Sequence, residues 1–565
     1  MPSTPDLSDL LHRARGWIDD DPDPATRAEL TDVLAGAEAG DESAAADLAD
    51  RFSGLLEFGT AGLRGALGAG PNRMNRAVVL RAASGLVSWL QAEGGIAEPM
   101  VVVGYDARHN SNVFARDTAA VVVAAGGRAS VLPHPLPTPV LAFAIRHLGA
   151  DAGVMVTASH NPSQDNGYKV YLGDGSQIVP PVDAQIAAHI NAIEQTADIA
   201  VTDDGWETLS NDLVDDYLGA VGRVVTPDSP RDLSVVHTSL HGVGNDVVLA
   251  AFERAGFPVP LAVPSQAEPD PDFPTVAFPN PEEPGAIDAA LALARDVTPD
   301  LVIANDPDAD RVAAAVLDPA VGDWRMLRGD EVGALLGAHL LARGIPDGGV
   351  LANSIVSSRL LAVMAAAAGV AHEETLTGFK WIARVPGLAY GYEEALGYCV
   401  APGTVRDKDG VSAALVLAEL AATSKAQGRT LLDLLADLAV AHGVHATDSF
   451  SVRVTDRAQT DGLMGRLRSQ PPTAVGGSPV THVDDLARGD GGLPPTEGLR
   501  WWLADGSRVI VRPSGTEPKV KVYLECVEPV VAGSGDDPAA LAAARRTASD
   551  RLATVREELE ALTRS

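Results

Sequence analysis

The sequence predicts an α/β protein in which three similar α/β units follow one another and a smaller α+β unit closes the chain. From Met100 onward, short apolar runs alternate with longer helical segments, which is typical of parallel sheets covered by helices. Beyond residue 446, the apolar runs are separated by loops rich in Pro and Gly, and a long helix follows them. The length of 565 residues agrees with this division, because about 150 residues per domain would give about four domains.

Residues 1–54 are predicted to form a helical extension before the first unit. Leu7–Trp17 has amphipathic spacing, the run Asp19–Pro24 interrupts it, and two acidic, Ala-rich segments follow. Acidic helical surfaces of this kind are usually solvated, and we expect the same of this extension.

The first unit is assigned to residues 55–210 and the second to residues 211–325. In the first, the expected strands are Met100–Asp106, Ala129–Leu132 and Asp151–Val156. The helices expected between them are Asn112–Ala125 and Pro139–Leu148. In the second, strands Leu233–His237 and Leu301–Ala304 are expected to enclose helices Asn245–Ala255 and Ala286–Arg295. A short apolar run bounded by polar residues fits a strand that is buried on both faces.

The third unit is assigned to residues 326–445 and the fourth to residues 446–565. The third should contain, in order, helix Asp330–Arg343, strand Val350–Asn353 and helix Ser358–Ala368. In the fourth, a closing helix Pro538–Leu562 should follow the strands Phe450–Val454, Trp501–Leu503, Arg508–Val511 and Lys519–Cys526.

Composition excludes several classes of protein. The net charge is −33, and no basic run offsets it, so we expect no nucleic-acid partner. Two cysteines cannot form a disulfide framework or a thiolate metal site. Met1–Leu11 lacks the features of a signal peptide, and the longest apolar run, Leu360–Ala368, is too short to span a bilayer. We therefore expect a soluble cytoplasmic protein without a membrane partner.

The first chemical motif is Thr157–Pro162, which directly follows a predicted strand and contains Ser159. A serine at such a turn can be an exposed nucleophile, with backbone N–H groups around it that bind an anion. The alternative is that Ser159 only caps the turn, which is a common role for serine. Lys169 follows ten residues later and is expected on the same loop system.

The second motif, Asn305–Arg311, follows the apolar run Leu301–Ala304 and carries three carboxylates at alternate positions. Asp306, Asp308 and Asp310 can converge on one hard cation such as Mg²⁺, which prefers oxygen ligands. An acidic surface loop is the alternative, but three carboxylates held together without a cation would repel one another.

The third motif is Arg512–Lys519, which joins two predicted strands. Its arginine, two hydroxyls and glycine could direct several donors at one phosphate. A simple hairpin rich in Pro and Gly is the alternative.

Four further segments are weaker candidates. Carboxylates in Tyr392–Ala395 could hold sugar hydroxyls, and a lysine in Arg406–Gly410 could carry a proton or act as a charge clamp. Phe58–Gly65 is a Gly-rich loop that ends near an arginine, but it does not fit the nucleotide-binding patterns. Thr377–Trp381 is the weakest candidate of the four. For Tyr392–Ala395 and Arg406–Gly410, the alternative is an exposed charged loop.

Together, these motifs resemble the α-D-phosphohexomutase family, which includes phosphoglucomutase and phosphomannomutase. The loops around Ser159, Asp306, Glu393 and Arg512 occur in the family's order, and the matching segments extend over nearly all of the chain. The resemblance implies four domains around a central cleft, with the fourth domain closing over the site.

The resemblance also implies a role for each motif. Ser159 would carry the phosphoryl group, and one Mg²⁺ ion would be bound by the phosphoserine oxygen with three aspartates: Asp306, Asp308 and Asp310. Arg64, Lys169 and Arg311 would flank the phosphoserine, and His160 and Lys408 are the proton-transfer candidates. The sugar and its non-reacting phosphate would be held by Thr377, Gly378, Glu393, Arg512, Ser514, Gly515 and Thr516.

The implied activity is an intramolecular phosphotransfer that interconverts sugar 1-phosphate and 6-phosphate, with glucose and/or mannose as the sugar. It would pass through a phosphoserine and a sugar bisphosphate, and sugar 1,6-bisphosphate would be the activator. The expected partners are small-molecule sugar phosphates, and the protein would be a monomer or a dimer.

The sugar loop departs from the commonest family patterns, because Ala395 offers no hydroxyl where a serine would contact sugar. With Asn280–Pro284, this loop is similar to a branch that also holds phosphopentomutases and sugar-bisphosphate synthases. These two activities are therefore alternatives within the family.

Two alternatives lie outside the family. A haloacid-dehalogenase-type phosphatase would use Asp306 as its nucleophile, but it would leave Ser159 and the Arg512 loop without a role. A sugar-phosphate-binding protein without catalysis is the other, although none of the expected catalytic side chains is missing.

Overall fold

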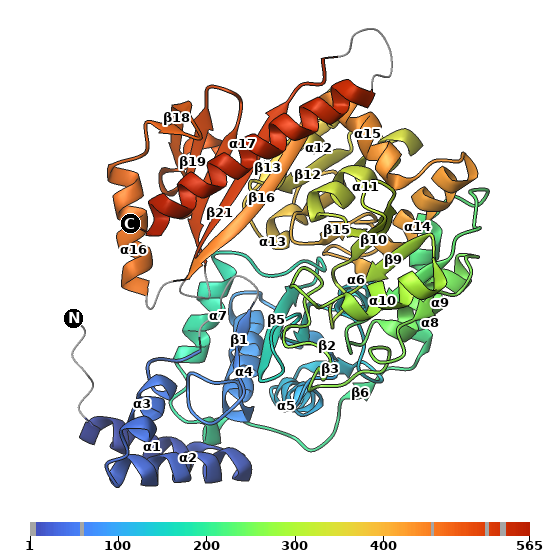
Figure 1. The fold of residues 1–565 in the computed structure, drawn as a ribbon. Helices are drawn as coiled ribbons and strands as arrows, with labels where there is room; N and C mark the ends of the chain where they lie inside the picture. The colour runs from blue at the N-terminus through green and yellow to red at the C-terminus, as the bar shows by residue number, and fades with distance from the viewer. Residues whose placement is uncertain (1–6, 57–61, 454–456, 515–518, 532–537, 565) are drawn as a thin grey trace. The chain divides into compact units, whose positions relative to one another are not determined.

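The computed structural model describes residues 7–56, 62–453, 457–514, 519–531 and 538–564 (Figure 1). The chain divides into two compact units. The first comprises Met1–Ala314 with Ala401–Leu415, and the second comprises Ala315–Val400 with Val416–Ser565. The boundary therefore crosses the chain at three points.

Three helices open the first unit: α1 (Leu7–Asp20), α2 (Pro24–Glu38) and α3 (Glu42–Arg51). They lie beside one another in Figure 1 and share a small core that includes Leu30, Leu48 and Phe52. Helices are thus present where the sequence predicts them. The segment is not simply solvated, however, because Asp20 accepts hydrogen bonds from the Arg81 side chain and the Thr196 amide.

The first sheet has the strand order β1-β5-β4-β2-β3-β6. Its strands are β1 (Leu63–Ala66), β2 (Met100–Tyr105), β3 (Arg128–Val131), β4 (Ala152–Val156), β5 (Asp165–Leu172) and β6 (Glu207–Thr208). Its helices are α4 (Arg76–Ala92), α5 (Ser111–Ala124), α6 (Thr138–Leu148), α7 (Val182–Asn191) and α8 (Asp212–Val221). Strand β2 is parallel to β3 and β4, and its apolar run is buried on both faces.

The second sheet has the order β11-β10-β9-β7-β8, and the boundary between the two units falls in β10. Its strands are β7 (Val235–Thr238), β8 (Leu261–Ala262), β9 (Leu301–Ala304), β10 (Ala313–Asp318) and β11 (Asp323–Met326). Its helices are α9 (Asn245–Arg254) and α10 (Asp288–Val297). Strand β7 is parallel to β8 and β9, so these strands end at one edge of the sheet.

The third sheet, with the order β13-β12-β14-β15, belongs to the second unit. Its strands are β12 (Val350–Ser354), β13 (Ala371–Thr375), β14 (Leu388–Glu393) and β15 (Gly397–Cys399). The nearby helices are α11 (Gly329–Arg343), α12 (Leu360–Ala367), α13 (Phe379–Ile382), α14 (Gly410–Ala426) and α15 (Leu431–His442). Strand β12 is parallel to both of its neighbours.

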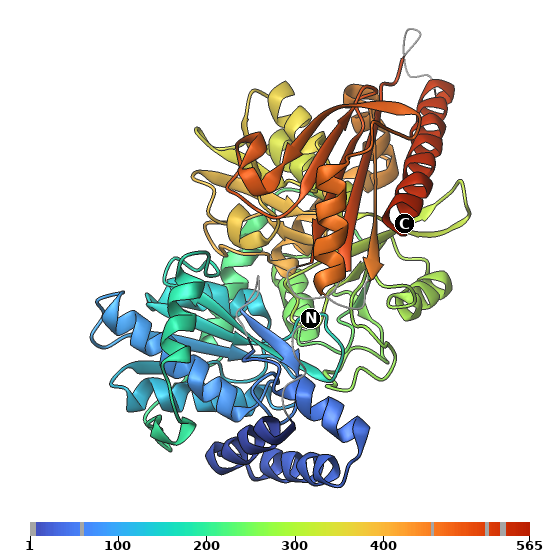
Figure 2. The same ribbon diagram turned by 90° about the vertical axis from the view of Figure 1, so that its left-hand side faces the viewer.

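The fourth sheet has the order β16-β21-β20-β19-β18-β17, and all of its pairings are antiparallel. Its strands are β16 (Val444–Arg453), β17 (Ala474–Val475), β18 (Ser478–Asp485), β19 (Leu499–Leu503), β20 (Arg508–Pro513) and β21 (Lys519–Glu528). Helices α16 (Arg457–Ser469) and α17 (Pro538–Arg564) cover one face of this sheet (Figure 2).

The four sheets confirm the predicted fold class of three α/β units followed by an α+β unit. The structure contains more strands than the sequence predicts, and it also differs from the prediction at Lys169 and at the start of β16. Lys169 lies on strand β5 rather than on the predicted loop. The sequence does not predict this strand, because polar residues interrupt its apolar run. Strand β16 begins at Val444, six residues before the predicted start. The first half of this strand is also polar, so its apolar pattern does not show in the sequence. Within the ranges that the structure describes, no helix combines the length and apolarity needed to cross a membrane.

Candidate active site

Ser159 lies in the turn that follows β4, at the carboxyl end of a central strand. Its φ of 52° lies in the left-handed region, which residues other than glycine rarely adopt. The Ser159 amide donates a hydrogen bond of 2.8 Å to the Thr157 hydroxyl, and the residue is buried. A strained and buried serine of this kind is typical of functional sites.

A buried arginine that sequence reasoning missed holds the serine turn in place. Arg108 Nη2 donates to the carbonyl oxygens of Ser159, at 2.6 Å, and Asn161, at 2.5 Å. Its Nη1 donates to the Pro162 carbonyl at 2.7 Å. Arg108 follows β2, and Asp106 lies 3.4 Å from its Nε. The signal in the sequence was an acid and an arginine two residues apart directly after an apolar strand.

The three aspartates of the second motif converge after β9. Asp306 and Asp308 are fully buried and Asp310 is 1% exposed, so the alternative of an acidic surface loop is wrong. One carboxylate oxygen of each lies within 4.8 Å of the others. The Oδ1 atoms of Asp308 and Asp310 are buried and have no hydrogen-bond partner among the residues that the structure describes. An all-oxygen site with unsatisfied acceptors fits a hard divalent cation.

Ser159 contacts this carboxylate cluster directly. Its hydroxyl donates a hydrogen bond of 2.7 Å to Asp306 Oδ2, although the two residues are 147 positions apart in the chain. The hydroxyl is therefore used for more than capping its own turn. Thr138, at the start of α6, donates a second hydroxyl hydrogen bond of 2.6 Å to Asp308 Oδ2.

Cationic side chains surround the same carboxylates. Lys169 Nζ lies 2.7 Å from Asp308 Oδ2 and 3.0 Å from Asp310 Oδ2, and Lys408 Nζ lies 3.1 Å from Asp310 Oδ2. Burial alone would lower the pKa of Lys169, but Asp308 and Asp310 raise it above its usual value. Lys169 is therefore charged at neutral pH and can balance the negative charge of a phosphoryl group.

Two predicted arginines also lie in this cluster. Arg64, on β1, donates a hydrogen bond of 3.0 Å to Asn161 Oδ1 in the serine turn. The Arg311 amide donates to Asp306 Oδ1, and its Nε lies 3.8 Å from Asp310 Oδ1. Both guanidinium groups are thus fixed beside the serine turn and the aspartates.

His160 is placed to exchange a proton with Ser159. Its Nδ1 lies 3.3 Å from Ser159 Oγ and 3.8 Å from Asp306 Oδ2. Burial, followed by the charges of Arg311 and Arg64, holds the pKa of His160 well below its usual value. The imidazole is therefore neutral at neutral pH and able to accept a proton.

Lys408 is positioned by buried tyrosines of the first unit. The Tyr171 hydroxyl donates to Asp407 Oδ2 and the Tyr217 hydroxyl donates to Asp409 Oδ1, both at 2.9 Å. The Gly410 amide bonds to the Ala309 carbonyl, within the aspartate loop. The segment that carries Lys408 is therefore buried, and the alternative of an exposed charged loop is wrong for it.

The second unit carries the predicted sugar loops at the carboxyl edge of its parallel strands. Glu393 ends β14 and is 7% exposed, so it is not on an exposed charged loop. Thr377 and Gly378 lie between β13 and α13, and Gly378 has a φ of 111° that favours glycine. Parallel strands that end together bring such loops to one edge of a sheet.

The predicted phosphate loop begins at the end of β20. Arg512 is partly exposed, and the Ser514 amide donates a hydrogen bond of 2.8 Å to the Lys519 carbonyl. Gly515 and Thr516 lie outside the described residues. Sequence reasoning missed Tyr523 of β21, a buried residue whose side chain lies close to that of Arg512. Burial, with a contribution from the nearby charge of Glu394, raises the pKa of Tyr523.

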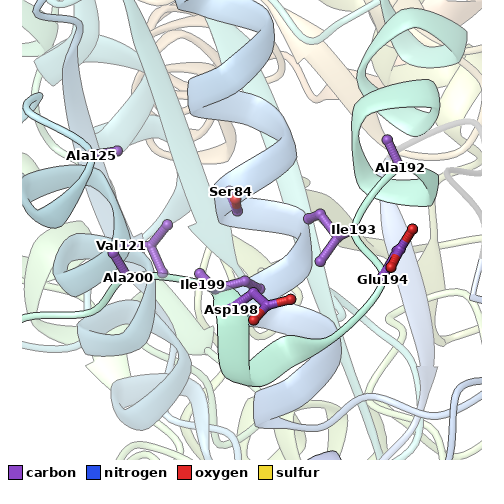
Figure 3. A pocket seen from close by; sticks show the side chains of 9 residues that line it. All are labelled: Ser84, Val121, Ala125, Ala192, Ile193, Glu194, Asp198, Ile199 and Ala200. Atoms are coloured by element: carbon purple, nitrogen blue, oxygen red, sulfur yellow. The ribbon is translucent and has the colours of Figure 1, made fainter.

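A pocket elsewhere in the first unit contains none of the predicted site residues. It lies between α4, α5 and the segment that follows α7 (Figure 3). It is lined by Ser84, Val121, Ala125, Ala192, Ile193, Glu194, Asp198, Ile199 and Ala200. The charged residues of this lining are both acids, so it does not combine carboxylates with cations as the serine turn and the aspartates do.

Comparison with models of known protein families shows to which family the chain belongs. Four models described as phosphoglucomutase/phosphomannomutase domains match it: α/β/α domains I, II and III at residues 55–197, 215–319 and 328–440, and the C-terminal domain at residues 452–536. The chain belongs to the phosphoglucomutase/phosphomannomutase family. This family consists of enzymes that interconvert sugar phosphates, and its match over four domains argues against the haloacid-dehalogenase alternative.

Relatives within the phosphoglucomutase/phosphomannomutase family differ in the sugar that their names give. A protein of Haemophilus influenzae named "Probable phosphomannomutase" is 46% identical, covering 80% of this chain and 93% of its own. A mouse protein named phosphopentomutase is 35% identical, covering 91% of this chain and 89% of its own. The solved structure of parafusin, a phosphoglucomutase from Paramecium, shares the fold with a TM-score of 0.68 and 20% identity, covering 89% of this chain and 95% of parafusin.

Proposed function

We propose that the protein interconverts the 1- and 6-phosphates of glucose and/or mannose through a phosphoserine at Ser159 and a sugar bisphosphate. The observation that carries this proposal is the contact of 2.7 Å between Ser159 Oγ and Asp306 Oδ2 inside a buried cluster of carboxylates and cations. Phosphoryl transfer depends mainly on positioned charge, which this cluster supplies.

The transfer step is written from these side chains. The bond between phosphorus and Ser159 Oγ breaks as phosphorus bonds to a sugar hydroxyl, and the hydroxyl proton passes to a base. Neutral His160 would take that proton, and the Lys408 ammonium, paired with Asp310, would be the candidate that donates one in the reverse transfer. In the second half of the reaction, the other phosphate of the bisphosphate returns to Ser159, and the proton moves back. Arg64, Lys169 and Arg311 would offset the charge of the phosphoryl group in both halves.

The metal requirement follows from the carboxylates. Asp306, Asp308 and Asp310 would hold one Mg²⁺ ion together with an oxygen on Ser159, and their unsatisfied buried oxygens support this assignment. Bound there, Mg²⁺ would supply a Lewis acid that stabilises charge on a phosphoryl oxygen.

Substrate recognition is assigned to the second unit. Glu393, Thr377 and Gly378 would hold sugar hydroxyls. The non-reacting phosphate would be gripped by Arg512, Ser514, Gly515 and Thr516. Sugar 1,6-bisphosphate would act as the activator, because it can load Ser159 with its first phosphoryl group. Binding energy at the distal phosphate would fix the reacting end of the sugar.

The alternatives within the family concern the sugar. A hexose is favoured by the relative of highest identity reported above, which is named for mannose. Phosphopentomutase is the second candidate, because Ala395 lacks a hydroxyl and the mouse relative matches most of the chain. Sugar-bisphosphate synthesis remains a third. We also propose a cytoplasmic monomer or dimer with domains at 55–210, 211–325, 326–445 and 446–565.

A mutase assay tests the proposal. Glucose, mannose and ribose 1-phosphates are offered side by side with Mg²⁺ and catalytic glucose 1,6-bisphosphate, and free phosphate is measured in parallel. We expect isomerisation that disappears in Ser159→Ala and persists in Ser163→Ala, a control four residues away. Release of free phosphate that survives in Ser159→Ala would contradict a mutase and indicate a phosphatase.

A further inference from the structure

Glu394, the second acid of the sugar loop, has no role in the proposed reaction, yet it is bound more firmly than a surface acid would be. Its Oε2 accepts hydrogen bonds of 3.0 Å from the hydroxyls of both Ser354 and Ser357. The Glu394 amide donates a third, of 3.1 Å, to Ser357 Oγ. Glu394 therefore joins the sugar loop to one neighbouring segment, Ser354–Arg359, which we call the serine segment.

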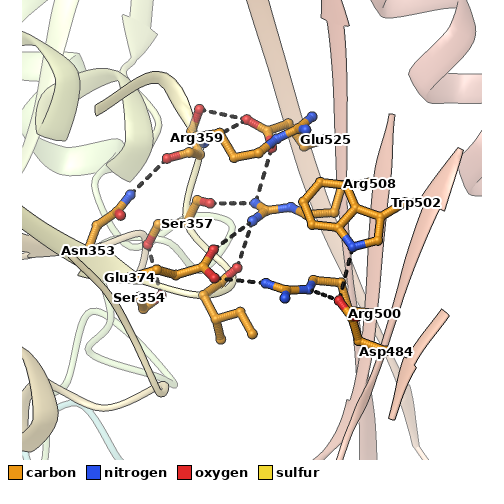
Figure 4. A network of polar contacts seen from close by, with 12 residues as sticks. Asn353, Ser354, Ser357, Arg359, Glu374, Asp484, Arg500, Trp502, Arg508 and Glu525 are labelled. Atoms are coloured by element: carbon orange, nitrogen blue, oxygen red, sulfur yellow. Dashed lines mark hydrogen bonds and ion pairs between the residues drawn. The ribbon is translucent and has the colours of Figure 1, made fainter. Parts of the chain in front are cut away.

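A buried arginine of the fourth sheet holds the serine segment by its backbone. Arg508 Nη2 donates to the Ser357 carbonyl at 2.6 Å, and its Nη1 donates to the Ile355 carbonyl at 2.9 Å (Figure 4). Arg508 is 3% exposed, so water cannot replace these bonds if the arginine is removed. The position of Ser357 is thus set from β20.

A buried carboxylate of the same sheet holds the other half of the segment. Glu525 accepts hydrogen bonds from Ser358 Oγ at 3.0 Å, from the Arg359 amide at 2.8 Å and from Arg359 Nε at 2.6 Å. Arg508 Nη2 lies 3.1 Å from Glu525 Oε2, so the two anchoring side chains are also paired with each other.

Apolar side chains pack around this network. Ile355 and Val356 of the serine segment form one buried cluster with Ile510 and Tyr523 of the fourth sheet and with Leu486, which directly follows β18. Hydrogen bonds beside such a cluster are shielded from water, which makes them geometrically stringent. Apolar contacts therefore add to the hydrogen bonds and ion pairs between the serine segment and the fourth sheet.

The register of β20 and β21 connects this anchor to the phosphate loop. Arg508 and Arg512 are four residues apart on β20, so their side chains leave the same face of the strand. Between them, Ile510 faces Tyr523 on β21, whose side chain lies close to that of Arg512. One strand thus carries the phosphate-binding arginine and the arginine that positions the serine segment.

We propose that Arg508, Ser357 and Glu394 form a positioning relay that fixes the distance between the sugar-binding carboxylate Glu393 and the phosphate-binding Arg512. This rests on the proposed function, in which these two residues hold the sugar and its distal phosphate. In this proposal, the relay residues act through Glu393 and Arg512 and not on the substrate itself. Because hexose 6-phosphates and pentose 5-phosphates differ by one carbon in the span from hydroxyl to phosphate, a fixed spacing selects between them.

Kinetics on two sugar classes test the relay. KM, kcat and the ratio of kcat/KM between glucose 1-phosphate and ribose 1-phosphate are measured for Ser357→Ala, Ser357→Thr, Arg508→Lys and the double variant Ser357→Ala/Arg508→Lys. In Ser357→Ala we expect KM for the preferred sugar to rise about tenfold, with kcat changed less than about threefold, because a hydrogen bond to a charged group is lost. Discrimination between the sugars should fall, and Ser357→Thr should restore it.

The matched control is Ser507→Ala, which removes another buried hydroxyl one residue before Arg508, outside the serine segment. It should leave the sugar ratio unchanged. The double variant should show less than the sum of the two single effects, since both residues act in one chain of contacts. Additive effects, or an unchanged ratio with parallel losses for both sugars, would overturn the relay.

Two further measurements keep the test decisive. Glu394→Ala removes the acceptor at the other end of the relay and replaces Ser357→Ala if that variant does not fold. Calorimetric binding of glucose 6-phosphate and ribose 5-phosphate reads the spacing without turnover. Failure of the proposed function would show as absent isomerisation in the unmodified protein, whereas failure of the relay would show as unchanged relative binding in the variants.

Discussion

Charge is used in opposite ways in two regions of the protein: the serine turn with its aspartates, and the phosphate loop. In the first region, the residues assigned to the reaction are themselves buried and bonded to one another, as Ser159, Asp306 and Lys169 show. In the second, Arg512 and Ser514 are partly exposed, while the buried ion pair of Arg508 and Glu525 lies behind them.

This difference in burial reflects two physical requirements, one for phosphoryl transfer and one for substrate binding. A phosphoryl group in transfer needs fixed charges in a site from which water is excluded, so the reacting groups are buried together. A sugar phosphate that enters and leaves needs accessible groups on a stiff support, so the buried charges form the support instead.

The largest effect is expected from breaking the first region. Asp308→Asn removes a carboxylate shared by Thr138 and Lys169, and kcat should fall about 10³-fold, since stabilisation by the metal is worth several kcal/mol. Steady-state kinetics over a range of Mg²⁺ concentrations measure this. Asp296→Asn, at an exposed position on α10, is the control, and equal losses in both variants would contradict the assignment.

A smaller effect, on binding, is expected in the second region. Arg512→Lys keeps the charge but loses the planar fork that matches phosphate, so KM should rise about tenfold with little change in kcat. Inorganic phosphate should inhibit this variant less than the unmodified enzyme. Arg546→Lys, exposed on α17, should change neither quantity. A loss confined to kcat would place Arg512 in the reaction rather than in binding.

The buried charges behind the sugar loop predict a pH dependence of stability. Asp330 accepts hydrogen bonds from the Ser358 amide and the Tyr392 hydroxyl. Burial raises the pKa of Asp330 to about 6, and the hydrogen bond from Ser358 only partly opposes this. Because the folded protein holds this proton more tightly than the unfolded chain, Asp330 favours folding at low pH and loses that contribution as pH rises from about 4 to 6.

Asp330→Asn isolates this contribution. Relative to the unmodified protein, the variant should gain about 2 to 3 kcal/mol of stability between pH 4 and pH 7. Unfolding of both proteins by heat and by urea at several pH values measures the difference. Parallel pH profiles would show that Asp330 is ionised in the folded state at both ends of the range.

The smallest effect is expected from the support of Lys408. Tyr217→Phe removes one hydroxyl, which donates to Asp409, so kcat/KM should fall about threefold to tenfold. Tyr398→Phe is the matched control, because its buried hydroxyl bonds to the Gly329 carbonyl and lies outside the Lys408 segment. Stability should fall in both variants, and activity only in the first. Equal activity losses would remove the special role of the Lys408 segment.

The sequence predicted what is local and missed what is distant. Ser159 and the aspartates stand directly after apolar strands, so their motif and their structural position were visible together. Arg108 contacts the serine turn from 51 residues away, and Ser357 contacts Glu394 from 37 residues away, and such contacts leave no spacing signal. Lys169 was predicted on a loop because β5 lacks a continuous apolar run.

The most direct test of the account is to follow the phosphoryl group itself. Purified protein is incubated with Mg²⁺ and isotopically labelled glucose 1,6-bisphosphate, and the labelled residue is located by peptide mass spectrometry before and after glucose 6-phosphate is added. The account predicts label on Ser159 that is discharged to the sugar as bisphosphate. Label on Asp306, or transfer of label in Ser159→Ala, would contradict it.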